Sequence, residues 1–273
     1  MIVTILGSGS AGNATLVEAQ GVRVLVDAGF SGRDLERRLQ AAGAPPASLA
    51  AIVITHEHGD HTRGMGVLAR RFGVPLHITP TTLSVCRALL SGKEQVRPYT
   101  VAHPFRIGPF EVQPFLTAHD AADPVAVTLR EVATGFKLGI ATDLGRPTAA
   151  VHHALAGCHL LVLEANHDEA MLWNGPYPWS VKQRIASSHG HLSNRAAAEL
   201  VGELCHETLG GVVLAHLSEH CNRAELAEDV VGETLAAVGY GGALCVAPQD
   251  RPLEPIDLAA LKRRAGPAQL SLF

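Results

Sequence analysis

Residues able to bind metal ions are concentrated in the segment Thr-His-Glu-His-Gly-Asp-His at residues 55–61. Side chains two residues apart on an extended chain point the same way, so His56 and His58 can bind one cation. Asp60 and His61 follow at the turn into a predicted helix and can reach a second cation beside it. Three imidazoles and a carboxylate suit zinc, with manganese as the second choice. The alternative is a polar loop that only caps the helix, and four ligand-type residues in six positions argue against it.

More ligand-type side chains follow other β-rich runs, namely His119, Asp143 and His216. Taken singly, each is more often a capping or hydrogen-bonded polar residue than a ligand. Because all three recur at the same end of successive predicted strands, we expect them to complete a site for two divalent cations.

Short β-rich runs separated by turn residues are expected to position these side chains. The order of strands and helices predicts an α/β fold, an αββα sandwich of two mixed β-sheets flanked by helices. We expect a catalytic domain over residues 1–254 and a C-terminal helix and tail over residues 255–273. The predicted strands are 2–6, 15–19, 22–26, 51–55, 110–116, 125–131, 136–142, 160–164, 212–215 and 243–246; the predicted helices are 32–42, 63–72, 81–90, 194–207, 222–238 and 258–264.

Composition narrows the class of protein. The 273 residues carry 22 Lys and Arg against 26 Asp and Glu, and their 15 histidines outnumber Phe, Tyr and Trp together. The net charge of −4 means that any contact with nucleic acid must be local. No apolar run is long enough to span a membrane, and the start lacks the basic residues of a signal peptide. Five cysteines without a CxxC pair favour a cytoplasmic location with reduced thiols.

The HxHxDH run, with an aspartate before it and three ligand-type residues after it, resembles the metallo-β-lactamase superfamily. The resemblance implies the fold of that superfamily and a site for two metal ions. It also implies that Asp27, in Val-Asp-Ala-Gly, orients the ligands from behind. The implied ligands are His56, His58 and His119 for one ion, Asp60, His61 and His216 for the other, and Asp143 between them.

Two later segments narrow the reaction. The stretch Ser-His-Gly-His-Leu-Ser-Asn at residues 188–194 is similar to the Gly-His-Ser/Thr stretch of the tRNA 3′-processing endonucleases of this superfamily. That similarity implies that His191 protonates the leaving oxygen and that Glu164 orients it, so that Asp60, His191 and Glu164 are the expected catalytic residues. The alternative for His191 is a loop residue before a helix. His167 and His189 receive no role.

Over its catalytic length the chain most resembles the YycJ/WalJ branch of the superfamily. The matching stretches are 7–13, 15–18, 118–121, 164–168, Tyr-Pro-Trp at 177–179, and 189–194, with a departure at 219–222. This resemblance implies a phosphodiesterase that hydrolyses DNA from 5′ to 3′ in repair or replication. The alternative function is a metallohydrolase of small phosphodiesters or thioesters. A non-catalytic binding module is the third, and the intact ligand set argues against it.

Two further segments suggest contacts with the substrate or a partner. The loop at residues 8–13 is built of small residues whose N–H groups can approach a phosphate, and the alternative is a plain Gly-rich turn. Its candidate phosphate-binding residues are Ser8, Gly9, Ser10 and Asn13. Isolated cationic side chains can contact the phosphates of a DNA backbone, or they can simply be solvated on the surface. The candidates are Arg63, Arg97, Lys182, Arg184 and Arg195.

The last five residues resemble the short peptides with which bacterial replication and repair enzymes dock on the sliding clamp. The resemblance implies that Leu272 and Phe273 enter an apolar pocket while Gln269 makes hydrogen bonds, with Leu270 between them. The alternative is an apolar terminus folded onto its own domain. Such docking would make the clamp a second partner besides DNA.

Overall fold

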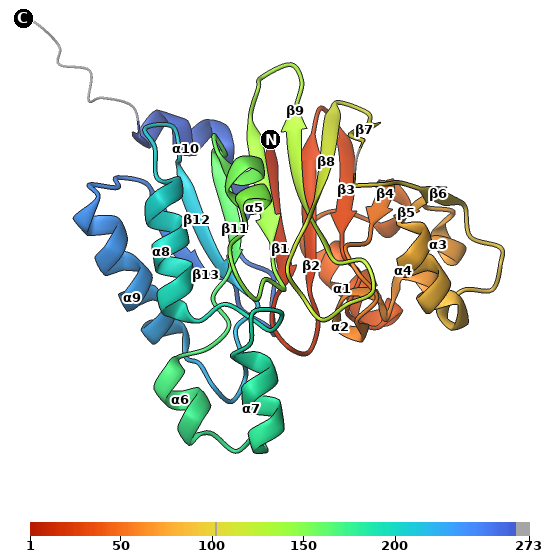
Figure 1. The fold of residues 1–273 in the computed structure, drawn as a ribbon. Helices are drawn as coiled ribbons and strands as arrows, with labels where there is room; N and C mark the ends of the chain where they lie inside the picture. The colour runs from red at the N-terminus through yellow and green to blue at the C-terminus, as the bar shows by residue number, and fades with distance from the viewer. Residues whose placement is uncertain (102, 266–273) are drawn as a thin grey trace, which may run out of the picture.

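Two seven-stranded β-sheets pack face to face, with helices on both outer faces (Figure 1). The computed structural model describes residues 1–101 and 103–265. The predicted αββα sandwich of two mixed sheets is confirmed. Within the described residues, no helix is both long and apolar enough to cross a membrane.

The first sheet begins as an antiparallel meander and continues with parallel strands. Its order is β14-β1-β2-β3-β4-β5-β6, and the strands from β3 onward are parallel. The strand bounds are β1 Ile2–Gly7, β2 Ala14–Ala19, β3 Val22–Val26, β4 Leu49–Val53, β5 Leu76–Ile78, β6 Val96–Pro98 and β14 Ile256–Asp257.

The second sheet repeats this plan. Its order is β13-β12-β11-β10-β9-β8-β7, antiparallel from β7 to β10 and parallel from β10 to β13. Strands β11 and β12 of the parallel part are buried along their whole length, as expected for strands covered on both faces. The strand bounds are β7 Phe105–Ile107, β8 Phe110–Leu116, β9 Val125–Glu131, β10 Lys137–Ala141, β11 Leu160–Glu164, β12 Gly211–Ala215 and β13 Ala243–Val246.

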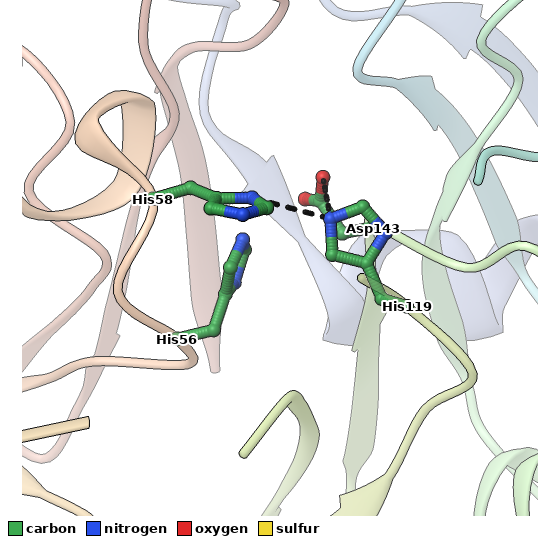
Figure 2. A group of neighbouring side chains, drawn as sticks. All are labelled: His56, His58, His119 and Asp143. Carbon is green, nitrogen blue, oxygen red and sulfur yellow. Dashed lines mark hydrogen bonds and ion pairs between the residues drawn. The ribbon is translucent and has the colours of Figure 1, made fainter. Parts of the chain in front are cut away.

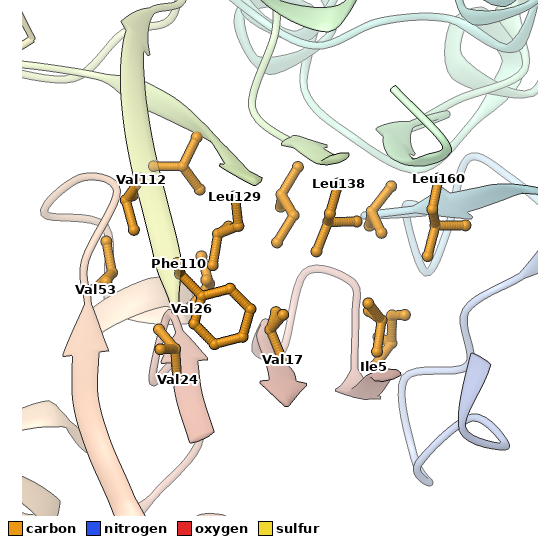
Figure 3. Close-up of a cluster of buried hydrophobic side chains, with 14 of the residues drawn as sticks. Ile5, Val17, Val24, Val26, Val53, Phe110, Val112, Leu129, Leu138 and Leu160 are labelled. Atoms are coloured by element: carbon orange, nitrogen blue, oxygen red, sulfur yellow. The ribbon is translucent and has the colours of Figure 1, made fainter. Parts of the chain in front are cut away.

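The main core lies between the two sheets (Figure 3). Alternate residues of each strand point inward because side chains of a strand alternate between its faces. Ile5, Val17 and Val24 of the first sheet meet Phe110 and Leu129 of the second, and all five are buried. This core fixes how the two sheets are placed, and therefore how their strand ends face each other.

Helices cover the outer faces through two further apolar clusters. Leu35 of α1 and Leu68 of α3 pack on the first sheet, and Val151 of α5 and Leu200 of α8 pack on the second. Helices α6 and α7 project beyond the end of the second sheet (Figure 1). The bounds are α1 Gly32–Ala41, α2 Gly59–Thr62, α3 Met65–Phe72, α4 Pro80–Val85, α5 Ala149–Leu155, α6 Glu169–Asn174, α7 Trp179–Ile185, α8 Asn194–Leu204, α9 Ala224–Ala237 and α10 Leu258–Ala265, with short 3-10 turns at Pro46–Ser48 and Cys86–Leu89.

The structure departs from the predicted elements in three ways. The predicted helix 63–72 begins two residues later, as α3 at Met65, and the short helix α2 before it was not predicted. The short strands β5, β6, β7 and β14 and the helices α5, α6 and α7 were not predicted. The C-terminal segment expected from residue 255 begins as β14, which pairs with β1, and Leu258 enters the core between the sheets.

Candidate metal centre

The predicted ligand residues gather at one edge of the sandwich, where strands of both sheets end. Parallel strands present their carboxyl ends at the same edge, which is where sites in α/β folds form. The side chains make three groups, in each of which the ligand atoms lie within 4.8 Å of one another. The groups are His56, His58, His119 and Asp143; Asp60, His61 and His216; and Asp143, Glu164, His191 and His216.

The backbone is strained where three of these strands end. Among the described residues, the non-glycine residues with positive φ are Gln20, Asp27, Asp143 and His216. The last three have φ of 61°, 58° and 56°, and each follows a strand that runs into the site. Such conformations are unfavourable for residues with a Cβ and concentrate at functional sites. The strain here turns the side chains of Asp27, Asp143 and His216 toward the cluster.

The first group has the geometry of a cation site. The rings of His56, His58 and His119 have centroids 4.7 to 5.3 Å apart and converge with Asp143 on one space (Figure 2). Nδ1 of His58 and Nε2 of His119 are 3.2 Å apart. Zinc bonds of about 2.0–2.1 Å in a tetrahedron put ligand atoms about 3.3 Å apart. Nε2 of His56 is buried without a hydrogen-bond partner, as expected of an atom reserved for a metal ion.

The second group lies against the first and shares Asp143 with it. Nε2 of His61 is 2.9 Å from Oδ2 of Asp143 and 3.4 Å from Oδ2 of Asp60. Nε2 of His216 is 3.2 Å from the same Asp60 oxygen. Asp143 Oδ1 is 3.4 Å from Nε2 of His119 in the first group. Asp143 therefore contacts histidines of both groups, one through each of its carboxylate oxygens.

The other ring nitrogens of these histidines are held by the protein. Carboxylates and carbonyls only accept hydrogen bonds, so Nδ1 of His61 donates to Asp27 at 2.7 Å and Nδ1 of His216 donates to Glu164 at 2.8 Å. In the same way, Nδ1 of His119 donates to the Gly190 carbonyl at 2.9 Å. These bonds fix the tautomer and aim each Nε2 into the cluster, which is how proteins orient metal-binding histidines.

Charge complementarity keeps the carboxylates of the cluster ionised. Burial raises the pKa of Asp60, but His61 and His216 beside it hold the pKa well below its usual range. Burial likewise opposes ionisation of Asp143, and the same two histidines hold its pKa low. Burial lowers the pKa values of His61 and His216, but the surrounding carboxylates raise both well above the usual value. The buried Asp143 and the partly buried Asp60 thus offer anionic oxygen ligands.

The predicted acid, His191, lies beside the two groups. Its Nδ1 donates to Oε1 of Glu164 at 2.7 Å, and Oε2 of Glu164 accepts the backbone N–H groups of Leu144 and Leu192. Burial lowers the pKa of His191, but Glu164 outweighs it and raises the pKa above its usual value. Because Nδ1 is engaged, Nε2 is the nitrogen available to a substrate. The structure therefore places the ring of His191 against the carboxylate of Glu164.

These groups line a cavity of about 400 Å³. Its lining includes Asp60, Asp143 and His216 of the candidate centre. The segment between β11 and α8 contributes a further set, Asn166, Tyr177, Val181, Arg184, Ile185 and His191. The volume falls within the range of small-molecule and cofactor sites.

The loop at residues 8–13 is used differently from the prediction. Gly9 N–H donates to the Asn13 side chain, Ser8 N–H to Pro248, and Asn13 N–H to Asp60. Ser8 Oγ accepts the His216 N–H at 2.9 Å. The amides of Ser8, Gly9 and Asn13 are thus occupied inside the protein, and only Ser10 of the four candidates lines the cavity. The loop therefore supports the candidate centre through hydrogen bonds within the protein. The prediction that the N–H groups of these three residues bind a phosphate is wrong.

The contacts that Asn13, Thr55 and Gly190 make with the candidate ligands were not predicted from the sequence. Asn13 Nδ2 lies 3.3 Å from Oδ2 of Asp60, and Thr55 Oγ1 lies 3.0 Å from Nδ1 of His56. Thr55 and Gly190 each directly precede a candidate histidine in the sequence, which was the available signal. The residues of the predicted clamp-binding peptide, Gln269, Leu270, Leu272 and Phe273, lie outside the described residues.

Comparisons with known proteins agree with this geometry. A family model described as "Beta-lactamase superfamily domain" matches residues 22–217. The chain is 35% identical over 240 residues to Exodeoxyribonuclease YycJ of Bacillus anthracis, covering 87% of this chain and 90% of that protein. It is 34% identical over 242 residues to Exodeoxyribonuclease WalJ of Streptococcus pneumoniae serotype 2, covering 87% and 89%.

A solved structure agrees at the level of the fold. The metallo-β-lactamase fold protein YhfI from Bacillus subtilis matches with a TM-score of 0.69 at 20% identity, covering 92% of this chain and 98% of that chain. The family match, the relatives and the His/Asp cluster agree with one another. The chain therefore belongs to the β-lactamase superfamily, has the metallo-β-lactamase fold, and is a metal-dependent hydrolase.

Proposed function

We propose that this hydrolase is an exodeoxyribonuclease that cuts DNA from 5′ to 3′ in repair or replication. The observation that carries the proposal is the His191–Glu164 pair at the edge of the candidate metal centre. Nδ1 of His191 lies 3.8 Å from Oδ1 of Asp143. A phosphodiester releases an alkoxide, which needs a proton, and a histidine with a raised pKa supplies one near neutral pH. Identity to two exodeoxyribonucleases supports DNA as the substrate.

Two divalent cations fit the cluster. The donor atoms are imidazole nitrogens and carboxylate oxygens, a set that suits zinc best and manganese second. Two cations bound there would supply an activated water as the nucleophile and would neutralise the charge of the phosphate. The ligands would be His56, His58 and His119 for one, Asp60, His61 and His216 for the other, with Asp143 between them.

Side chains of the protein would orient the ligands, supply the proton and bind the phosphate. Asp27 and Glu164 hold His61 and His216 in place through hydrogen bonds of 2.7 and 2.8 Å. Glu164 keeps a proton on Nδ1 of His191, so the proton on Nε2 is the one transferred to the departing oxygen. Arg184 at the cavity wall is a cation within reach of a bound phosphodiester.

The proposal also includes a location and two partners. Cys86, Cys158, Cys205, Cys221 and Cys245 are all free thiols, which supports the reducing cytoplasm. DNA would be the substrate, and the bacterial sliding clamp would bind the C-terminal residues 269–273.

A comparison of substrates tests the activity. Duplex DNA labelled at the 5′ end is offered beside bis-p-nitrophenyl phosphate and a thioester, each with Zn²⁺ or Mn²⁺. We expect the 5′-labelled duplex to release labelled mononucleotides at the start of the reaction. The same duplex labelled at the 3′ end should lose its label only at the end of the reaction. Failure on DNA with rapid turnover of the thioester would contradict the proposal and favour the alternative, a small-molecule hydrolase.

A further inference from the structure

The segment between β11 and α8 carries an exposed aromatic surface beside the metal centre. Helices α6 and α7 of this segment project beyond the end of the second sheet (Figure 1). Both tryptophans of the chain lie on them, Trp173 with 42% and Trp179 with 64% of its surface exposed. Tryptophan is usually mostly buried, and neighbouring exposed aromatic side chains indicate a binding surface.

This surface is continuous with the candidate metal centre. Tyr177 lines the cavity just before α7 begins, and Val181, Arg184 and Ile185 of α7 line the same cavity. The last three are spaced i, i+3 and i+4, so they share one face of the helix. Trp179 falls on the other face, outside the cavity. The aromatic surface therefore adjoins the cavity at Tyr177, two residues before Trp179 in the chain.

The indole rings of Trp173 and Trp179 lie close to each other. Their ring centroids are 5.3 Å apart with planes inclined by 39°. The buried Lys182 donates to the Trp173 carbonyl at 2.8 Å, which ties α7 to the end of α6. Tyr177 is steadied by the ring of His220, with centroids 5.7 Å apart. The aromatic rings are thus presented on tethered helices, so little order would have to be gained on binding.

We propose that Tyr177, Trp179 and Trp173 form a stacking platform for unpaired bases of the DNA strand that enters the metal centre. This inference rests on the proposed function and adds how the strand is held. Bases stack on aromatic side chains whatever their sequence, and nearby cations hold the phosphates. Arg184 fits that second role, because its side chain is 66% exposed and lines the cavity, and its one ion pair with a described residue is long, at 3.6 Å from Asp120.

Tryptophan fluorescence tests the platform directly, because the only two tryptophans of the chain are both in it. The metal-loaded protein is titrated with a phosphorothioate oligothymidylate of about 12 nucleotides, which resists hydrolysis and has the length of known single-strand sites. We expect the emission to be quenched by the single strand and much less by a blunt duplex of the same length. Unchanged emission at saturating oligonucleotide would overturn the inference.

Substitutions at Trp179 distinguish a loss of base stacking from a loss of folding stability. Because Trp179 is mostly exposed, Trp179→Ala should leave the melting temperature unchanged while raising Kd for the single strand about 5- to 100-fold. Trp179→Phe, which keeps a ring, should stay within about threefold of the wild type. Val238→Ala, an exposed apolar residue at the end of α9, is the matched control and should bind as the wild type does.

The outcomes for the platform and for the proposed function can be told apart. Equal single-strand Kd for Trp179→Ala and the wild type, in a protein that still degrades DNA, would overturn the platform alone. Quenching by the oligonucleotide in a protein that degrades no DNA would uphold the platform as a binding surface and refute the nuclease activity.

Discussion

Oε1 of Glu164 lies 2.7 Å from Nδ1 of His191 and accepts a hydrogen bond from its N–H group. The same oxygen also accepts the Nδ1 proton of His216 at 2.8 Å. One buried carboxylate thus links the proposed proton donor to a proposed metal ligand. Because His191 and His216 share this oxygen, a change at Glu164 is expected to affect both proton transfer and metal binding.

Glu164→Gln should slow DNA hydrolysis about 10- to 100-fold, the usual effect of losing a group that orients metal ligands. It should also change the pH profile. Glu164 raises the pKa of His191, whereas burial lowers it. Without the carboxylate, the pKa falls and His191 loses its proton at lower pH. The alkaline limb of kcat should therefore move to lower pH, and an unmoved limb would show that His191 is not the group that titrates.

Metal loading should release protons. Carboxylates raise the pKa values of His61 and His216 well above the usual value, so both are protonated in the metal-free protein at pH 7. A cation must displace these protons, so affinity should fall as pH falls. Calorimetry of Zn²⁺ binding at pH 7 in two buffers of different ionisation enthalpy should give about two protons released. Identical heats in both buffers would contradict this arrangement.

Gly29→Ala should damage the metal centre from outside it. A Cβ at Gly29 would lie 1.6 Å from the Asp60 carbonyl, so the segment that carries Asp60 and His61 would have to move. We expect a loss of about 1–3 kcal/mol of stability, measured by urea unfolding, together with reduced bound metal. Gly241→Ala, where an added Cβ meets nothing within 4 Å, is the control. Full metal content in Gly29→Ala would mean that the segment tolerates displacement.

Removal of residues 268–273 should abolish binding to the sliding clamp and leave hydrolysis of free DNA unchanged. The reason is that the peptide would supply two apolar side chains and a glutamine to the clamp, and none of them is among the site residues. Surface plasmon resonance with immobilised clamp measures the first effect, and release of labelled nucleotides measures the second. Equal affinity of the shortened and full-length proteins would refute the docking peptide.

Much of the site could be predicted from sequence because its ligands follow apolar strands. His56 and His58 stand beyond β4, and Asp143 and His216 beyond β10 and β12, so pattern alone indicated one shared edge. The second partner of Glu164 could not be predicted. It depends on β11 pairing with β12 in a register that sets Glu164 opposite Ala215, beside His216. The register between strands that are distant in the sequence depends on tertiary structure, so the local sequence pattern does not predict it.

The unpredicted elements have a similar cause. Strands β5, β6 and β7 are three residues long, too short to show an alternating pattern. Helices α6 and α7 span six and seven residues, and most of α7 is exposed, so no apolar stripe marks it in the sequence. The aromatic surface was therefore visible only as an isolated Tyr-Pro-Trp motif until the fold placed it beside the cavity.

The most direct test of the account compares His191→Ala with the wild type on two substrates of different leaving group. On DNA, whose alkoxide needs a proton, kcat should fall about 100- to 10,000-fold. On bis-p-nitrophenyl phosphate, whose nitrophenolate leaves unaided, the fall should be less than about tenfold. His189→Ala, an exposed neighbour, is the control and should retain wild-type rates. Equal losses on both substrates would contradict the role of His191 as the proton donor in phosphodiester hydrolysis.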